Sequence, residues 1–377
     1  MKRQKEDRPK GAKEIETCDW KRWRLEKKLQ RQKWKEERTL KKLEKKNKTH
    51  ASVDGQKASQ DDSQPVGRKY TLSIAVPGSI MENAQNAELR TYLAGQIARA
   101  AVVFCVDEIV VYDDYGSTTS KTSSTTEGEF SGVSERGQGA LQLARVLQYL
   151  ECPQYLRRHL FPIHRDLQFA GLLNPLDCPH HLRASEECPY REGVVASLPV
   201  KEGSGSFVNC GLEKEVKIDR CLQPGVRVTV KMAPAEPGRK RRGQAVSPSC
   251  PRTEGGLYWG YEVRLARSLG AVLAEAPHPG GYDLTLGTSE RGDPVDALEL
   301  PSRFKHAIVV FGGLKGLEAA LECDEALDVE DPAFLFSHYL NTCPGQGSRT
   351  IRTEEAVLIS LSVLRPKISA AQSGSPT

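Results

Sequence analysis

Three predicted strands in the C-terminal half of the chain end in glycine-rich turns. The turns are Gly287-Thr288-Ser289, Gly312-Gly313-Leu314 and Pro344-Gly345-Gln346-Gly347-Ser348. Glycine lets the backbone approach a ligand closely and adopt positive φ, and ligands of open α/β sheets bind beyond the carboxyl ends of the strands. Together the turns predict a pocket lined by main-chain N–H and C=O groups, which suits a planar heterocycle such as adenine. The alternative is that each glycine only makes its own turn.

Motifs for several other chemistries do not occur in the sequence. It contains no GxxxxGK[ST] phosphate loop, no GxSxG elbow and no complete GxGxxG fingerprint. Cys343 could be proposed as a nucleophile, but a Cys that closes a strand is more often a small buried apolar residue. The ten Cys include no CxxC pair, so a clustered zinc site is not expected. His180 and His181 are adjacent and would point apart on a regular element.

The length and charge of the chain indicate how many domains can position these turns and which class of protein they belong to. The chain has 377 residues, which fits two domains, and its 54 Lys and Arg against 49 Asp and Glu give a net charge of +5. Residues 1–50 hold 20 basic and 9 acidic side chains, a net of +11, so the remainder holds 34 and 40, a net of −6. Neither a long apolar run nor a secretory signal is visible. We expect a soluble intracellular protein.

Residues 1–65 form a basic tail. Residues 20–48 lack Gly and Pro and are rich in helix formers, and three of the four Trp lie here, at Trp20, Trp23 and Trp34. One interpretation is a disordered solubilising tail. The other is a conditional helix that becomes ordered on an acidic partner, either RNA or an acidic protein surface.

The rest of the chain begins and ends with an α/β pattern. TLSIAVP (71–77) and EIVVYD (108–113) predict strands, and apolar residues repeat at helical spacing from Leu89 to Phe104 and from Leu143 to Leu150. After residue 263 the pattern returns, and it closes with a helix from Thr353. Alternating strands and helices predict a parallel sheet.

Short strands interrupt this pattern between residues 190 and 262. REGVVASLPV, GSFVNCG, KEVKID, GVRVTVKM and GYEVRLA predict a small five-stranded OB-like β-barrel. The predicted domains are therefore a tail (1–65), a discontinuous α/β domain (66–189 and 263–372) and an insert (190–262). The basic loop of the insert is a candidate RNA contact; a solvated hairpin tip or a nuclear-import signal is the alternative. It consists of Arg239, Lys240, Arg241 and Arg242.

These motifs resemble those of SPOUT-class RNA methyltransferases. The matching segments are Gly287–Gly292, VVFGGLKGLE (309–318) and NTCPGQGSRTIRTEEA (341–356), and Asn83 to Phe104 resembles the first motif of the family. The resemblance covers about 70–189 and 263–370. It implies a trefoil-knotted α/β domain with an inserted OB-like barrel, S-adenosylmethionine as cofactor and a homodimer. It also implies methylation of RNA, with a base of ribosomal RNA or tRNA favoured over a ribose.

The resemblance also implies roles for individual residues. Cofactor contacts fall on three loops, at Thr288, Arg291, Gly292, Gly312, Gly313, Leu314, Asn341, Thr342, Cys343, Gly345, Gln346, Gly347, Ser348 and Ile351. Arg99 and Arg291 are catalytic candidates, and one subunit's arginine can complete the other's site. Glu290 is a candidate proton acceptor, with a solvated surface charge as the alternative. Glu354 and Glu355 follow the third loop, and the alternative to a role at the site is that they complement the dipole of the last helix.

Two functions from different classes stay open. The first is an RNA methyltransferase, and the second is a non-catalytic protein that binds RNA or an acidic surface and has a vestigial cofactor pocket. The intact glycine turns favour the enzyme. A nuclear or nucleolar location is expected, with the cytoplasm as a further place.

Overall fold

The computed structural model describes residues 67–373 except 116–123, 127–128, 132–136, 201–203 and 235–240. The predictions for the tail (1–65), Arg239 and Lys240 therefore lie outside the described residues. None of the helices in the described ranges is long and apolar enough to cross a membrane.

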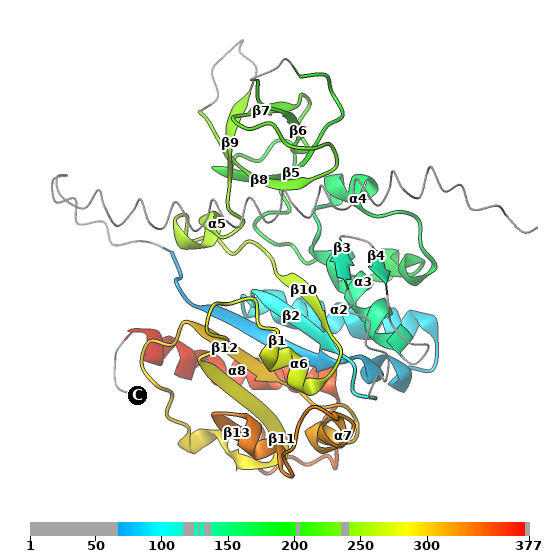
Figure 1. Cartoon of the computed structure of the whole chain (residues 1–377), viewed down its shortest axis with the longest axis vertical. Coiled ribbons are helices and arrows are strands. Elements are labelled where there is room, and N and C mark those ends of the chain that lie inside the picture. The colour runs from blue at the N-terminus through cyan, green and yellow to red at the C-terminus, as the bar shows by residue number, and fades with distance from the viewer. Residues whose placement is uncertain are drawn as a thin grey trace, which may run out of the picture. The chain divides into compact units, whose positions relative to one another are not determined.

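A six-stranded parallel sheet forms the centre of the α/β domain (Figure 1). Its strands, in spatial order, are β10 (Glu262–Ala266), β2 (Glu108–Tyr112), β1 (Thr71–Pro77), β12 (His306–Val310), β11 (Leu284–Pro294) and β13 (His338–Asn341). Because every neighbouring pair is parallel, all carboxyl ends lie along one edge of the sheet.

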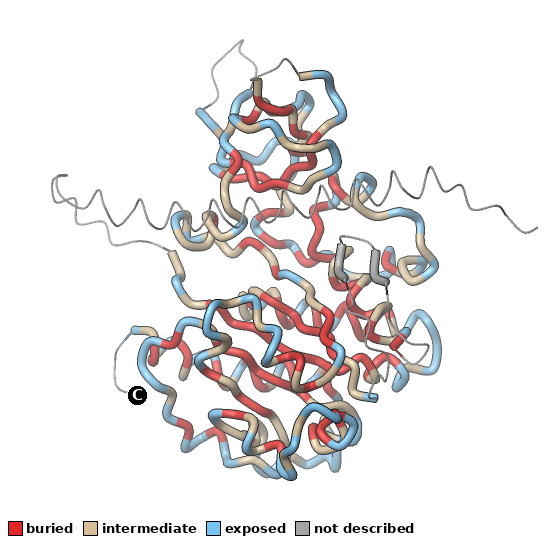
Figure 2. The backbone as a smooth tube through the Cα atoms, in the orientation of Figure 1, coloured by how far each residue is buried: buried red, intermediate tan, exposed pale blue. Residues whose placement is uncertain are grey.

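Helices cover both faces of this sheet. They are α2 (Ala87–Val103), α3 (Gln138–Glu151), α6 (Leu269–Ala274), α7 (Gly316–Glu322) and α8 (Thr353–Ser373). Ile74 and Val76 of β1 pack in the core with α2, α3 and α8, whereas Ala75 packs in the core with α6 and α7. This alternation is the period-2 pattern of a strand buried on both sides, and Figure 2 shows the central strands buried throughout. The predicted α/β fold class is confirmed.

A separate closed barrel lies within the predicted insert. Its strands are β5 (Tyr190–Val195), β6 (Phe207–Asn209), β7 (Val216–Ile218), β8 (Arg227–Met232) and β9 (Arg242–Val246), closed in the order β5-β6-β7-β9-β8. The prediction that GYEVRLA is the fifth barrel strand is wrong. It forms β10, which pairs with β2 at the edge of the parallel sheet, and β9 closes the barrel instead.

Two short strands and two short helices lie outside the sheet, its covering helices and the barrel, and the described chain also contains short 3-10 helices. The hairpin β3 (Ser124–Thr126) and β4 (Glu129–Ser131) lies between β2 and α3. The helix α4 (Gln154–Leu160) follows α3, and α5 (Cys250–Thr253) follows the barrel.

A buried ionic network joins the barrel to α3. Arg227 of β8 donates to both carboxylate oxygens of Glu151 at 2.7 and 3.0 Å and to Glu192 at 2.8 Å. His180 Nε2 lies 3.0 Å from the Glu151 carboxylate. We call these four residues the junction cluster. Burial acts to raise the pKa of Glu151, but Arg227 and His180 hold it well below its ordinary value. Glu151 is therefore a carboxylate.

Candidate functional site

The three predicted glycine turns lie side by side at the carboxyl edge of the sheet. They belong to β11, β12 and β13, which are neighbours. Side chains tie the turns to one another: Thr288 donates to the Val310 carbonyl at 3.0 Å and Asn341 donates to the Glu290 carbonyl at 3.0 Å. Thr353 at the start of α8 donates to the Gly312 carbonyl at 3.0 Å. Segments far apart in sequence therefore form one continuous surface of main-chain groups.

The first glycine segment is a bulge within a strand. Leu340 of β13 pairs with both Thr288 and Asp293 of β11, so residues 289–292 protrude between two paired stretches. The prediction that this strand ends at Ser289 is therefore wrong. A Cβ on Gly292 would lie 2.5 Å from the Leu340 carbonyl carbon, which explains why the bulge closes on a glycine.

The second glycine turn is closely packed on its inner side. A Cβ on Gly312 would lie 2.6 Å from the Gly316 carbonyl carbon. A Cβ on Gly313 would lie 2.9 Å from Ser79 Oγ and 3.2 Å from Asp114 Oδ2. The neighbouring Leu314 side chain is exposed. Neighbouring atoms therefore leave no room for side chains on the two glycines. The exposed Leu314 offers an apolar contact of the kind that an adenine-sized ring needs.

The third glycine turn is open on its outer side. A Cβ at Gly345 or Gly347 would meet nothing within 4 Å, although φ at Gly345 is +71°. The base of this turn is held by Thr342, whose hydroxyl lies 2.8 Å from Ser360 Oγ, and by Cys343 N–H, which donates to Asn341 Oδ1 at 3.0 Å. A fixed base and an open tip leave room for a ligand, so the three loops fit a planar cofactor with hydrogen-bonding edges.

Asp114 is a site residue that sequence reasoning missed. It follows β2, and its carboxylate accepts hydrogen bonds from Ser79 N–H at 3.2 Å and from Ser79 Oγ. Burial raises the pKa of Asp114 above its ordinary value, although Ser79 opposes the shift. The visible signal was Asp113-Asp114 directly after a buried strand, where ligands of parallel sheets bind.

Glu290 and Arg291 lie exposed on the bulge of β11. Arg291 forms an ion pair with Glu318 of α7 at 3.3 Å, with 73% of the arginine side chain exposed. Tyr339 O–H lies 3.5 Å from the same Glu318 carboxylate. Both predicted residues are thus at the edge of the site, where an incoming substrate can reach them.

The description "Putative RNA methyltransferase" belongs to the family whose model matches residues 71–364. A human 28S rRNA (uridine-N(3))-methyltransferase is 58% identical over 307 residues, 81% of this chain and 80% of its own length. The chain belongs to this family. The Drosophila melanogaster 28S rRNA (uridine-N(3))-methyltransferase is 51% identical over 93% of this chain and 73% of its own length. The SPOUT-class RNA methyltransferase predicted from the motifs is confirmed.

A solved structure adds a weaker likeness. The SpoU methyltransferase AviRb from Streptomyces viridochromogenes, in complex with the cofactor AdoMet, is 11% identical, with a TM-score of 0.31. The aligned region is 83% of this chain and 63% of that one. A structural similarity this low supports no conclusion about the chain.

Arg99, the other catalytic candidate, lies away from the glycine turns in the single chain. The helix α2 runs back from the carboxyl edge toward the start of β2, and Arg99 is four residues from its end. The exposed Arg99 donates to the Leu176 carbonyl at 2.6 Å. The structure therefore does not bring Arg99 and Arg291 together within one chain. A cavity of about 360 Å³ also lies at this opposite end, beside Tyr70 and Arg365, and none of the glycine turns lines it.

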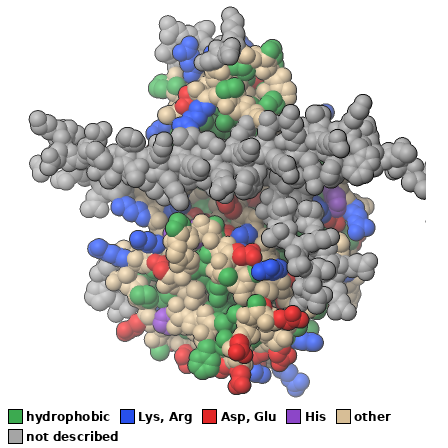
Figure 3. Space-filling view, viewed as in Figure 1, with side chains coloured by type: hydrophobic (Ala, Val, Ile, Leu, Met, Phe, Trp, Pro, Cys, Tyr) green, Lys and Arg blue, Asp and Glu red, His purple; other side chains and the backbone are tan. Residues whose placement is uncertain are grey.

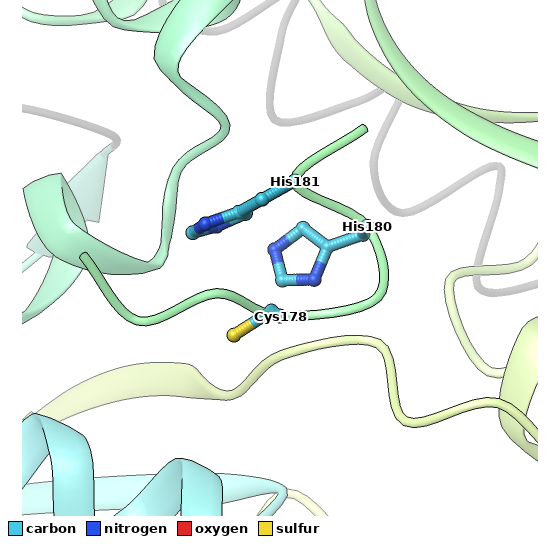
Figure 4. Close-up of side chains that lie close together, drawn as sticks. All are labelled: Cys178, His180 and His181. Carbon is cyan, nitrogen blue, oxygen red and sulfur yellow. The ribbon is translucent and has the colours of Figure 1, made fainter. Parts of the chain in front are cut away.

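Cys178, His180 and His181 lie together, with one ligand atom of each within 4.8 Å of the others (Figure 4). His180 lies in a turn and His181 directly after it, so the expectation for a regular element, on which the two side chains would point apart, does not apply here. Their ring centroids are 4.4 Å apart. However, both Nε2 atoms lie within 2.9 Å of the Glu151 carbonyl oxygen, to which each of them can donate a hydrogen bond. The trio packs around the end of α3, and we assign no ion to it.

Proposed function

We propose that this chain transfers a methyl group from S-adenosylmethionine to N3 of a uridine in large-subunit ribosomal RNA. The observation that carries the proposal is the set of three glycine turns tied together at one sheet edge. Two 28S rRNA (uridine-N(3))-methyltransferases at 58% and 51% identity support the choice of atom and RNA. The earlier expectation was only a base in ribosomal RNA or tRNA.

The cofactor would lie on main-chain groups of the predicted loop residues, from Thr288 to Gly292, Gly312 to Leu314 and Asn341 to Ile351. When bound it supplies an electrophilic methyl group on a sulfonium. The protein then has to hold the uridine N3 about 3–3.5 Å from that methyl carbon and in line with the sulfur. The exposed Arg291 is suited to hold a phosphate or a developing anion, since a guanidinium does not act as a base.

Asp114 is the residue we propose as proton acceptor. Methylation forms an N3–C bond and breaks the S–C bond, and the N3 proton must leave. The Asp114 carboxylate lies beside Gly313, Ser79 fixes its orientation, and burial raises its pKa, which makes it a stronger base. Glu290, the acceptor expected from the sequence, is exposed on the bulge and has no such support.

Calorimetry and methyl-transfer assays on the same variants test this proposal. Gly313→Trp should abolish saturable S-adenosylmethionine binding. Asp114→Asn should keep that binding and lower the transfer rate by about 10²–10⁴-fold, whereas Glu290→Gln, the matched control, should lower it far less. Unaltered transfer by Asp114→Asn would refute the assigned acceptor, and absence of cofactor binding by the wild type would refute the enzyme.

Mass-spectrometric mapping of nucleosides decides the methylated atom. Ribosomal RNA from cells without this protein should lack one N3-methyluridine that returns with the wild type and does not return with Gly313→Trp. If the protein binds RNA but no modified nucleoside depends on it, the non-catalytic alternative replaces the enzyme.

We further propose that the protein is a homodimer and that it is located in the nucleus or nucleolus. In a homodimer, Arg99 of one protomer would complete the site of its partner, because it lies far from Arg291 within one chain. Mixing Arg99→Ala with Arg291→Ala should then restore part of the transfer activity that each variant lacks. A nuclear or nucleolar location and binding of the basic tail to RNA or acidic proteins remain proposals as well.

A further inference from the structure

A groove beside α4 is separate from the glycine turns. It has a volume of about 670 Å³ and lies between α4 and the loop that follows it. The residues that matter among its lining are Tyr149, Arg157, Arg158, Phe161, Ile163 and His164. The helix is fixed to the barrel, because Tyr155 O–H donates to the Glu192 carbonyl at 2.9 Å and Asn209 Nδ2 lies 3.2 Å from His159 Nε2.

One wall of the groove is a stack of flat groups. The Arg157 guanidinium lies over the Tyr149 ring at 4.5 Å, and the edge of this ring meets Phe161 at 5.5 Å between centroids. Arg157 also donates to the Cys152 and Leu150 carbonyls at 3.0 and 3.2 Å. The wall is therefore held in place before any ligand binds, which lowers the entropy cost of binding. At its rim the Ile163 side chain is fully exposed.

The charge of the groove is positive and uncompensated. Arg157 bonds only to main-chain carbonyls among its described hydrogen bonds, and the exposed Arg158 has no described carboxylate partner. The two acids nearest in sequence have other partners: Glu151 pairs with Arg227, and Asp166 is engaged by Arg145 and lies 3.3 Å from His164 Nδ1. In Figure 3, basic and His side chains lie together at the right-hand edge of the view, in the region where Figure 1 draws the loop that follows α4.

The segment from α7 to the third glycine turn has the opposite charge. Residues 316–348 contain no Lys or Arg and seven acids: Glu318, Glu322, Asp324, Glu325, Asp328, Glu330 and Asp331. This segment contributes no positive charge that could hold phosphates. Because the remainder of the chain after residue 50 carries a net −6, RNA must be held by local positive surfaces.

We propose that the groove beside α4 binds a single-stranded segment of the RNA substrate, with phosphates on Arg157 and Arg158 and a base against Phe161 and Ile163. Aromatic faces next to guanidinium groups are the usual surface for unpaired nucleotides. An acidic protein partner would use the arginines, but it would leave the half-buried Phe161 ring and the exposed Ile163 side chain without a counterpart. The inference rests on the proposed function, since it names where that substrate is held.

The groove lies within reach of the glycine turns. Ala140, near the start of α3, lies against Gly78 at the carboxyl edge of β1, and a Cβ on that glycine would lie 2.5 Å from Ala140 Cβ. From Ala140 to Tyr149 the helix rises about 14 Å at about 1.5 Å per residue. A few nucleotides can therefore span from the groove to the site of methyl transfer.

Fluorescence anisotropy of the full-length protein with a labelled, unstructured uridine-rich oligoribonucleotide tests the groove. Arg158→Glu should weaken binding about 10-fold, and Phe161→Ala about 5-fold. For Arg158→Ala the slope of log K against log salt should fall by about 0.7 in magnitude. The matched control is Arg303→Glu, whose exposed side chain lies in the loop before β12, at the opposite edge of the sheet from the glycine turns; it should change affinity less than twofold.

Three outcomes distinguish the explanations. If Arg158→Glu and Phe161→Ala both bind RNA within twofold of the wild type, the groove is not an RNA site, even when methyl transfer is intact. If a poly-glutamate peptide of equal charge competes as well as RNA, an acidic protein partner replaces RNA. If RNA binding depends on the groove but the wild type binds no S-adenosylmethionine, the proposed enzymatic function is refuted, whereas the assignment of the groove as an RNA site is supported.

Discussion

The junction cluster and the carboxyl edge of the sheet are built by opposite means. At the junction, buried and half-buried charged side chains are joined by hydrogen bonds: Arg227 alone makes three hydrogen bonds to two carboxylates. At the carboxyl edge the glycine turns present main-chain groups, and the charged residues Glu290 and Arg291 are exposed. The first region presents charged side chains to one another, whereas the second presents main-chain groups that uncharged side chains hold in place.

This difference predicts where substitutions should act. A buried ion pair that loses one partner leaves a charge without compensation, so stability falls. In the open third turn, a side chain on Gly347 would meet nothing within 4 Å, so the fold tolerates the change while ligand contacts can be lost. Variants of the junction cluster should therefore lower stability first, and variants of the glycine turns should lower cofactor affinity first.

The largest effect is expected for Glu151→Gln. The substitution keeps the size of the side chain and removes the charge that two guanidinium nitrogens of Arg227 contact. The free energy of unfolding should fall by about 3–5 kcal/mol, the range for breaking one partner of a buried pair. Urea denaturation monitored by circular dichroism measures it.

The matched control is Glu275→Gln. Glu275 pairs with Arg267 at 3.8 Å and its side chain is 48% exposed, so its loss should change the free energy by less than about 0.5 kcal/mol. Equal effects of the two substitutions would show that the junction cluster contributes no more than a surface pair.

Acidification should weaken the junction before it affects the glycine turns. Burial and the neighbouring His180 lower the pKa of His181 from 6.5 to about 4, so the unfolded chain binds a proton more readily than the folded one. Stability is then lost as pH falls from 6.5 toward 4, by up to about 3 kcal/mol. The lowered pKa values of Glu151 and Glu192 act in the same direction below pH 4.5.

Denaturation at a series of pH values tests this expectation. His181→Asn removes the titrating ring and retains a side-chain N–H that can donate to the Glu151 carbonyl. Its stability should therefore fall less than that of the wild type between pH 6.5 and pH 4.5, and the remaining loss should come from His278 and His306, whose pKa values burial also lowers. A wild-type stability that is constant over this interval would contradict the assigned pKa.

The two regions also differed in how well they could be predicted. The glycine turns are contiguous motifs, so sequence alone located them and the parallel sheet placed them on one edge. The junction cluster joins residues that are 35 and 76 positions apart. From its neighbours in sequence alone, each of these residues would be predicted to be an ordinary exposed charge. Only the docking of the barrel against α3 brings them together.

The misplaced fifth barrel strand has a similar cause. GYEVRLA follows the barrel segments in sequence and has the same β-branched and apolar character, so periodicity alone could not assign it to the parallel sheet. The true fifth strand, β9, reads RGQAV and buries only Ala245 fully. Its strand character comes from main-chain pairing with β7 and β8.

Within the carboxyl edge, Gly313→Ala and Gly347→Ala form a matched pair. The new methyl group at Gly313 meets Ser79 and Asp114, whereas at Gly347 it meets nothing within 4 Å. We expect S-adenosylmethionine affinity to fall about 10-fold, or about 1.4 kcal/mol, for Gly313→Ala and less than threefold for Gly347→Ala. Calorimetric titration measures both. Equal losses would mean that the Ser79–Asp114 contact has no part in shaping the cofactor site.

The smallest effect concerns the ion pair between Arg291 and Glu318. The Arg291 side chain is 73% exposed, and the pair spans 3.3 Å, so a double-mutant cycle with both residues changed to Ala should give a coupling below about 0.5 kcal/mol in stability. Methyl transfer should respond differently. If Arg291 holds substrate, Arg291→Ala lowers the transfer rate at unchanged stability, while Glu318→Ala frees the guanidinium and leaves the rate equal or higher. Equal losses of rate in both variants would instead mean that the pair acts as one unit, and the contrast between a side-chain junction and a backbone-built edge would need revision at this position.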